Sequence, residues 1–271
     1  MSDDVKKTWQ QFVSEYQPPS EAAWINDFAF RCFRCFRDTG DGDYIAARLA
    51  LKAGLATQAI WSGLQAVEKY LKCMLLLRRV SSNGVGHKIA EGLRLVNDRL
   101  GCDIVLPDHE QAVFNRLAES CGDRYLVASL HLFAHELSGL DALVWRLRQY
   151  CDVLDVEHYN DKPSEEVLSR NLDKIKARLD GEPVGGHLER GVLERILADQ
   201  CNRAHEGLVW RNAMFGGRQP FSASSENFNF VATNSPLYLN PQIARAVTKL
   251  VHLPKGALEA FEELAMQRKS V

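Results

Sequence analysis

The sequence contains no long hydrophobic run. A helix that crosses a bilayer needs about 20 consecutive apolar residues, and no stretch of this chain approaches that length. The N-terminal segment MSDDVKKTWQ carries acidic and then basic side chains and lacks the apolar core of a secretory signal. We therefore expect a cytoplasmic protein that does not enter the membrane.

An excess of one charge and a disulfide framework are also missing. Lysine and arginine number 33 against 35 aspartate and glutamate residues, so the net charge is −2. Any nucleic acid would have to bind to a local basic patch, because no overall positive field attracts it. The seven cysteines are an odd number without the spacing of a disulfide scaffold. We expect them to be reduced thiols.

No segment shows a persuasive strand pattern, whereas helical spacing is clear. The stretch from Ala56 to Leu77 (ATQAIWSGLQAVEKYLKCMLLL) places its apolar residues at steps of three and four, on one helical face. These residues are Ile60, Leu64, Val67, Leu71, Met74 and Leu75. The polar residues Gln65, Glu68, Lys69 and Lys72 lie mostly off that face. The sequence predicts an all-α protein organised around this helix.

Turn and cap residues divide the chain into further helices. A helix is expected behind the cap residue Ser20, and the segment TGDGD at 39–43 predicts the turn that follows it. Residues 44–55 and 56–77 then form a helix pair, either continuous or broken near Gly54. The segment SSNGVG ends the pair, and His87 opens the next helix, which Gly101 stops. Later helices are expected from Pro107-Asp108, from Leu137 to Leu154, from Ser164, from Leu188 and from Asn240-Pro241, with a last helix to about Met266.

The segment FRCFRCFRD repeats three residue types at a spacing of three. On a helix such a step forms slanted stripes rather than a straight face. We interpret the phenylalanine and cysteine stripes as core, and the arginine stripe (Arg31, Arg34, Arg37) as solvated. The predicted organisation is an N-terminal helical segment (1–40), a helical bundle (41–156) and a helical C-terminal extension (160–271) with an irregular arm near 215–240.

Residues 43–152 resemble a HEPN domain, the helical family named for higher eukaryotes and prokaryotes nucleotide-binding. The resemblance rests on YIAARLALKAGLATQAIWSGLQAVEKYLKCMLL, on the glycine-containing turn after it and on GHKIAEGL. It implies an up-and-down bundle of HEPN type that pairs as a homodimer. Many members act in toxin–antitoxin or antiviral systems as endoribonucleases that need neither metal nor cofactor. A nucleotidyltransferase-type antitoxin is a common protein partner in the family.

Active members of the family carry an arginine, a polar residue and, some residues later, a histidine. The nearest match here is Arg124 to His131 (RYLVASLH), with Tyr125 in the polar position and His135 four residues further on. In a continuous helix Arg124 and His131 would share a face. A neutral histidine can take the proton of a ribose 2′-hydroxyl, and an arginine can stabilise the phosphorane. The segment YLVASL is also β-prone, so the alternative is that Arg124 makes a salt bridge and His131 has a packing or capping role.

Other candidate residues have both a functional and a structural interpretation. His87 could touch substrate or make a structural hydrogen bond at the helix start. Lys69 and Lys72 could contact nucleic acid or lie on a solvated or dimer face. The irregular arm near 215–240 contains several phenylalanines and a tyrosine, with Arg211 and Arg218 nearby in the sequence. This arm could stack on single-stranded bases or wrap over the bundle. For the pairs Cys32/Cys35 and Cys201/His205, free thiols are favoured over a zinc site, and we predict no metal.

The sequence thus predicts a HEPN-domain protein of prokaryotic defence or toxin–antitoxin type. One hypothesis is a metal-independent endoribonuclease that uses Arg124 and His131 and leaves a cyclic phosphate end. The alternative is a catalytically inactive HEPN module that binds or assembles through protein or nucleic-acid contacts.

Overall fold

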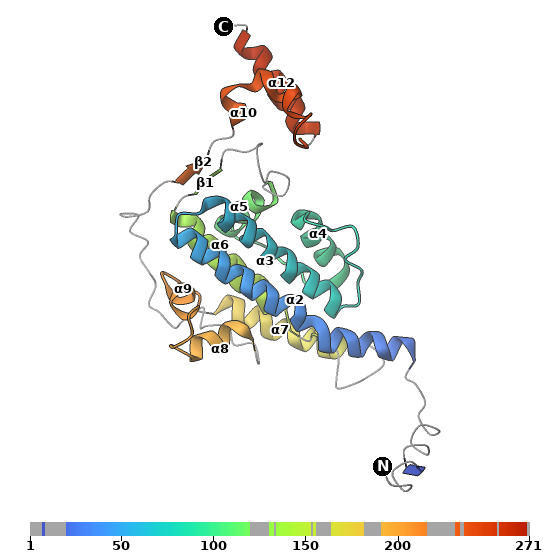
Figure 1. Cartoon of the computed structure of the whole chain (residues 1–271). Helices are drawn as coiled ribbons and strands as arrows, with labels where there is room; N and C mark the ends of the chain where they lie inside the picture. Colours follow the sequence, from blue (N-terminus) through green and yellow to red (C-terminus); the bar gives the residue numbers. More distant parts are fainter. Residues whose placement is uncertain are drawn as a thin grey trace.

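The computed structural model describes residues 7–8, 20–119, 130–132, 134–152, 154–155, 164–181, 191–215, 231–233, 236–253 and 255–269. Within these residues the fold is all-α apart from two strands of three residues each. No helix in the described ranges is both long and apolar enough to cross a membrane. Figure 1 shows a bundle of helices with a smaller helical group at the C-terminal end.

An antiparallel pair of long helices forms the centre of the bundle. Helix α2 (Glu21–Lys52) begins at Ser20, whose Oγ accepts a hydrogen bond of 3.2 Å from the Ala23 amide. Helix α3 (Ala56–Leu77) runs back along it, so that Cys73 Sγ lies 3.5 Å from the Phe33 carbonyl oxygen. The connection uses Gly54 at φ 73°, a left-handed conformation that glycine adopts without strain. The predicted break near Gly54 is confirmed.

The turn predicted at 39–43 is wrong, because α2 runs through it without interruption. The glycines and aspartates there serve helix packing. A Cβ on Gly40 would lie 3.1 Å from Tyr70 Cε1 and 3.4 Å from the Ala66 carbonyl oxygen, so glycine lets α3 approach closely. Asp41 is fully buried and accepts hydrogen bonds from Tyr70 and from Arg148. These tertiary contacts outweigh the local turn preference.

The stripes of the FRCFRCFRD segment are only partly as predicted. Phe33 is buried, as expected of core. Cys35 is exposed, however, and Arg37 is fully buried although its stripe was expected to be solvated. Arg37 lies over the Phe33 ring and bonds Asp38, while Arg31 remains 61% exposed beside Asp27. A step of three drifts around the helix, so members of one stripe reach different environments.

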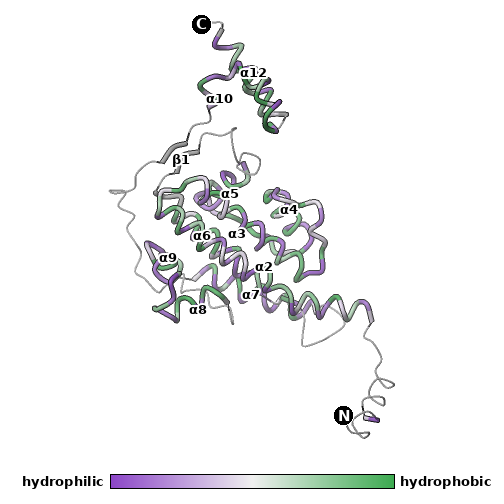
Figure 2. The backbone as a smooth tube through the Cα atoms, in the orientation of Figure 1, coloured by the Kyte–Doolittle hydropathy of each residue, from purple (hydrophilic) through white to green (hydrophobic). Residues whose placement is uncertain are grey.

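Three further helices complete the central bundle. They are α4 (Ile89–Leu100), α5 (Asp108–Glu119) and α6 (Ala134–Gln149). Gly101 ends α4 at φ 62°, as its predicted stop role requires. Helix α6 ends five residues before the predicted Leu154, although Cys151 and Leu154 are buried beyond it. In Figure 2 the helices alternate between hydrophobic and hydrophilic residues, as expected of amphipathic elements around one core.

Three more helices pack on this bundle: α7 (Glu165–Asp180) and the short α8 (Val192–Ala198) and α9 (His205–Val209). Two fully buried arginines join α8 and the α9 region to the bundle. Arg148 on α6 binds Asp41 on α2 and Glu194 on α8, each through two nitrogens. Arg48 on α2 pairs with the buried Asp141 and donates to carbonyl oxygens of residues 207 and 210. The region 191–215 therefore shares its buried polar contacts with the bundle.

The C-terminal part begins with a strand that the sequence analysis did not predict. Strand β1 (Leu130–Leu132) pairs antiparallel with β2 (Val231–Thr233), and His131 lies opposite Ala232. Helix α10 (Pro236–Leu239), a 3-10 turn (Pro241–Ile243), α11 (Ala244–Val247) and α12 (Lys255–Lys269) follow. They enclose a small core of their own, made by Leu237, Ala244, Leu253 and Phe261. Asn240 precedes the 3-10 turn but makes no side-chain cap bond.

Candidate functional site

Polar side chains from α3 and from the loop before α4 meet at the carboxylate of Glu68. Lys72 Nζ lies 2.6 Å from Glu68 Oε1, and His87 Nδ1 lies 2.7 Å from Oε2. Gln65 Nε2 is 3.3 Å from the same Oε2. Residues 65, 68 and 72 are spaced by three and four, so α3 presents them on one face. We call Gln65, Glu68, Lys72 and His87 the Glu68 cluster.

The loop that carries His87 is shaped by its glycines. Gly84 and Gly86 have φ values of 88° and 52°, which a residue with a Cβ rarely adopts. Val85 between them is buried and anchors the loop in the core. Helix α4 begins at Ile89, so His87 lies just before the helix that it was predicted to open. The loop thereby returns His87 to the polar face of α3.

Burial and hydrogen bonding determine the chemistry of this cluster. The Glu68 side chain is 7% exposed, whereas that of His87 is 43% exposed. A carboxylate can only accept hydrogen bonds, so the proton of a neutral His87 sits on Nδ1 and the basic lone pair on Nε2. The ring of Trp61 meets the imidazole edge to face at 5.4 Å between centroids. The arrangement fixes the tautomer and the orientation of a histidine that solvent reaches.

The two lysines predicted as weak nucleic-acid contacts are both ion-paired. Lys72 binds Glu68 within the cluster, and Lys69 binds Asp43 on α2. Each lysine side chain is less than one third exposed, at 21% for Lys72 and 28% for Lys69. Arg211 has its guanidinium 5.4 Å from the centroid of the Trp210 ring, and Arg218 lies outside the described residues. The three described cations are thus each in contact with another side chain of the protein.

The predicted pair Arg124 and His131 is only partly visible. Arg124 and Tyr125 lie outside the described residues, and for His131 and His135 the backbone alone is described. His131 belongs to strand β1, and His135 to the first turn of α6. His131 therefore does not share a helix with Arg124, in agreement with the β-prone character of the segment YLVASL. A catalytic role for the pair stays a prediction.

The other sequence candidates do not form a metal site within the described ranges. Cys32 is half-buried, and Cys35 and Cys201 are exposed. No group of three or more histidine, cysteine, aspartate or glutamate side chains among the described residues could hold a metal ion. Three other described thiols, Cys73, Cys102 and Cys151, are buried, and burial raises the pKa of Cys151 well above its usual value. Such a thiol is a poor nucleophile or ligand.

Sequence reasoning missed the central role of Glu68 and a hollow beside α7. The spacing of Gln65, Glu68 and Lys72 can be read from the sequence, but the burial of Glu68 cannot. A buried carboxylate needs hydrogen-bond partners, and His87 reaches Glu68 only once the loop is folded. The hollow is lined by Asp152, Leu154 and one polar face of α7. Its sequence signal is the recurrence of polar residues at 171, 174 and 178, which fall on one side of a helix.

Comparisons with protein-family models, with curated proteins and with solved structures find no match.

Proposed function

We propose that this chain is a HEPN-type helical protein that cleaves RNA without a metal ion, and that the Glu68 cluster supplies the reacting groups. The observation that carries the proposal is the hydrogen bond of 2.7 Å between the exposed His87 imidazole and the buried Glu68 carboxylate. A carboxylate behind a histidine orients the ring and stabilises the imidazolium that forms when the ring takes a proton. The resemblance of residues 43–152 to the HEPN family supports RNA as the substrate class.

The proposed reaction uses the 2′-hydroxyl of the RNA itself. His87 Nε2 accepts the hydroxyl proton, and the 2′-oxygen forms a bond to the adjacent phosphorus. The bond from phosphorus to the 5′-oxygen breaks, and that oxygen takes a proton from water. The hydroxide that remains takes the proton back from the His87 imidazolium. Lys72 donates one of its N–H groups to the other oxygen of the Glu68 carboxylate, and its charge offsets charge on the phosphorane. The products are a 2′,3′-cyclic phosphate and a 5′-hydroxyl end.

The test is cleavage of single-stranded RNA by the full chain in EDTA. We expect His87→Ala to lower the rate about 10²- to 10⁴-fold, the usual contribution of a positioned acid–base group. His109→Ala is the matched control, because His109 is exposed on α5 outside the cluster and should leave the rate unchanged.

Parallel variants separate this site from the pair predicted by the family motif. If Arg124→Ala and His131→Ala abolish cleavage while His87→Ala does not, the nuclease assignment holds but the Glu68 cluster is not its centre. An intact wild-type protein that leaves RNA uncut in every condition contradicts the nuclease proposal itself. A nucleotidyltransferase-type partner stays a prediction from the resemblance.

The second candidate function is a non-catalytic assembly module, and a separate feature favours it. The N-terminal part of α2 extends past the end of α3 (Figure 1) and carries large apolar side chains in the open. Trp24 is 51%, Ile25 46% and Phe28 56% exposed. Residues 24, 25 and 28 share one side of the helix, and such a stripe suits a contact with a second copy of the chain.

The oligomeric state measured by analytical ultracentrifugation tests this role. We expect a dimer that the double variant Trp24→Ser/Phe28→Ser converts to monomer. Leu55→Ser is the matched control, since Leu55 is 51% exposed at the opposite end of the α2–α3 pair. A monomeric wild-type chain, or a dimer that survives the double variant, contradicts the assembly role of this stripe.

A further inference from the structure

A hollow of about 510 Å³ lies between α7 and the segment that follows α6. Its volume falls within the range of about 300–1,000 Å³ that small-molecule sites occupy. Asp152 and Leu154 line it from the segment after α6, and Asn171, Lys174, Ile175, Ala177 and Arg178 line it from α7. None of these residues belongs to the Glu68 cluster, so the hollow is a separate site.

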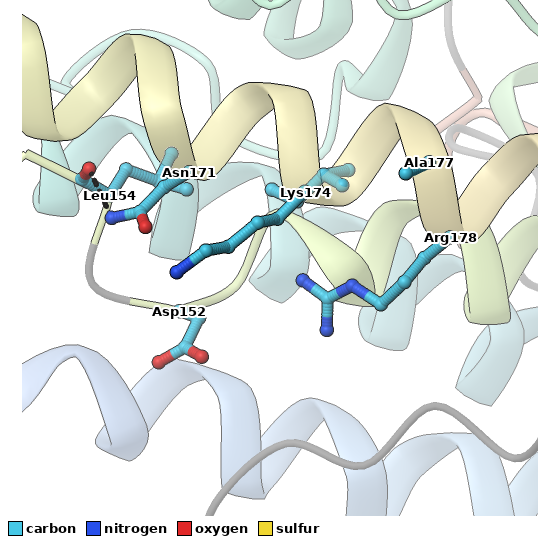
Figure 3. A pocket seen from close by; sticks show the side chains of 7 residues that line it. Asp152, Leu154, Asn171, Lys174, Ala177 and Arg178 are labelled. Atoms are coloured by element: carbon cyan, nitrogen blue, oxygen red, sulfur yellow. Dashed lines mark hydrogen bonds between the residues drawn. The ribbon is translucent and has the colours of Figure 1, made fainter.

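Two cations of α7 reach into the same space. Lys174 and Arg178 are one helical turn apart, and Figure 3 shows both side chains extending from α7 toward the side where Asp152 lies. The structure records no ion pair for either residue within the described ranges. Arg178 Nε is shielded from solvent and has no hydrogen-bond acceptor. The guanidinium of Arg178 thus lines the hollow without a carboxylate partner among the described residues, and an anion bound there would supply its counter-charge.

Other arginines of the fold show how Arg178 differs. Arg78 and Arg79 also have a shielded Nε without an acceptor, but both guanidinium groups bind the carboxylate of Asp155. Arg146 binds Glu110 through two nitrogens, at 2.6 and 3.0 Å. In these three cases the chain supplies the counter-charge. Arg178 is likewise partly buried, but it forms no ion pair with a carboxylate among the described residues.

The remaining walls indicate what else a ligand would carry. Asp152 lies across the hollow from α7, and a carboxylate there accepts hydrogen bonds from hydroxyl groups but repels a second phosphate. The Asn171 amide donates a hydrogen bond of 2.8 Å to the Leu154 carbonyl oxygen, which ties the segment after α6 to α7 at the edge of the hollow. Leu154, Ile175 and Ala177 provide apolar surface for a carbon skeleton. A ligand with an anionic group at one end and hydroxyl groups at the other matches this distribution of cations, carboxylate and apolar surface.

We propose that this hollow binds a small phosphorylated polyol of the sugar-phosphate class. Arg178 and Lys174 hold the phosphate, Arg178 through its planar fork and Lys174 as a point charge. Asp152 accepts hydrogen bonds from the sugar hydroxyls at the far side. The volume exceeds what a bare phosphate fills, which is why an organic body belongs to the ligand. The proposal does not depend on RNA cleavage.

Isothermal titration of the full chain with ribose 5-phosphate tests the site, with ribose and with sodium sulfate at equal ionic strength as comparison titrants. We expect saturable binding of ribose 5-phosphate and much weaker binding of the other two. Hydrogen bonds to charged groups contribute about 1.5–3 kcal/mol, so Arg178→Met should weaken binding about 10- to 100-fold. Lys176→Met is the matched control, because Lys176 is exposed on α7 and does not line the hollow.

The outcomes decide the proposal in both directions. Weakening by Arg178→Met and by Lys174→Met, with no effect of Lys176→Met, supports the site. Equal affinity for sulfate and ribose 5-phosphate shows an anion site without sugar recognition and overturns the assigned class. Absence of saturable binding, or binding that both hollow variants leave unchanged, overturns the proposal as a whole.

Discussion

Replacement of Asp41 by alanine should destabilise the fold far more than replacement of its neighbour Asp43. Asp41 is fully buried and accepts hydrogen bonds of 2.7 and 2.8 Å from Arg148 and of 2.8 Å from the Tyr70 hydroxyl. Asp41→Ala would leave the Arg148 guanidinium buried with Glu194 as its remaining counter-charge. Removal of one partner of a buried ion pair costs about 3–5 kcal/mol.

Asp43 provides the matched control on the same helix. Its carboxylate pairs with Lys69, but both side chains are nearly one third exposed, at 29% and 28%. Ion pairs in such settings contribute about 0–1 kcal/mol, so Asp43→Ala should have little effect. Both aspartates belong to the segment whose composition predicts a turn. The comparison therefore also tests whether that segment is a packed helix.

The assay is urea unfolding followed by far-UV circular dichroism. With an m-value near 3 kcal/mol/M, Asp41→Ala should lower the midpoint by about 1–2 M and Asp43→Ala by less than about 0.3 M. The double variant Asp41→Ala/Arg148→Met should recover part of the loss, because the fully buried guanidinium is then removed, while Glu194, whose side chain is 14% exposed, keeps access to water. Two single variants of equal stability would refute the reasoning, since they would place Asp41 in solvent.

Two other changes are predicted to shift stability. Gly42→Ala should stabilise the protein by up to about 1 kcal/mol in the same urea assay, because Gly42 lies inside α2 and a Cβ there meets nothing within 4 Å. Destabilisation by this variant would indicate that the backbone at Gly42 is not helical. Burial raises the pKa of Cys102 to about 11 from 9.0. Above pH 9 the unfolded chain therefore loses this proton first, and stability should fall by up to about 1.4 kcal/mol per pH unit to pH 11. The decline should be shallower in Cys102→Ala and unchanged in Cys201→Ala, and an unaltered slope in Cys102→Ala would contradict the assignment.

The helices were predictable from sequence because their apolar residues recur at helical spacing over long stretches. The helix 56–77 and the stops at Gly54 and Gly101 follow from local chemistry alone. The segment at 39–43 was not predictable in this way. Its glycines and aspartates favour turns in isolation, and the contact that reverses this preference comes from Arg148, 107 positions along the chain.

The candidate site shows the same division between local and distant information. The shared face of Gln65, Glu68 and Lys72 follows from spacing on one helix. The burial of Glu68 depends on His87, which the glycine loop returns to that face from 19 positions away. The cations of the α7 hollow lie on one predictable helix face, but Asp152 reaches them from a different segment. Only the folded chain brings such groups together.

The buried contacts of Arg48 and Arg148 have a consequence for any shortened version of the protein. A chain cut after the central bundle, near residue 160, would lack Glu194, which binds Arg148, and the backbone carbonyls of residues 207 and 210, which bind Arg48. Water would then have to solvate Arg148 and Arg48 at the place where α8 and α9 had shielded them. Domain mapping by truncation should accordingly keep the chain at least to Phe215, which is itself buried against Tyr44.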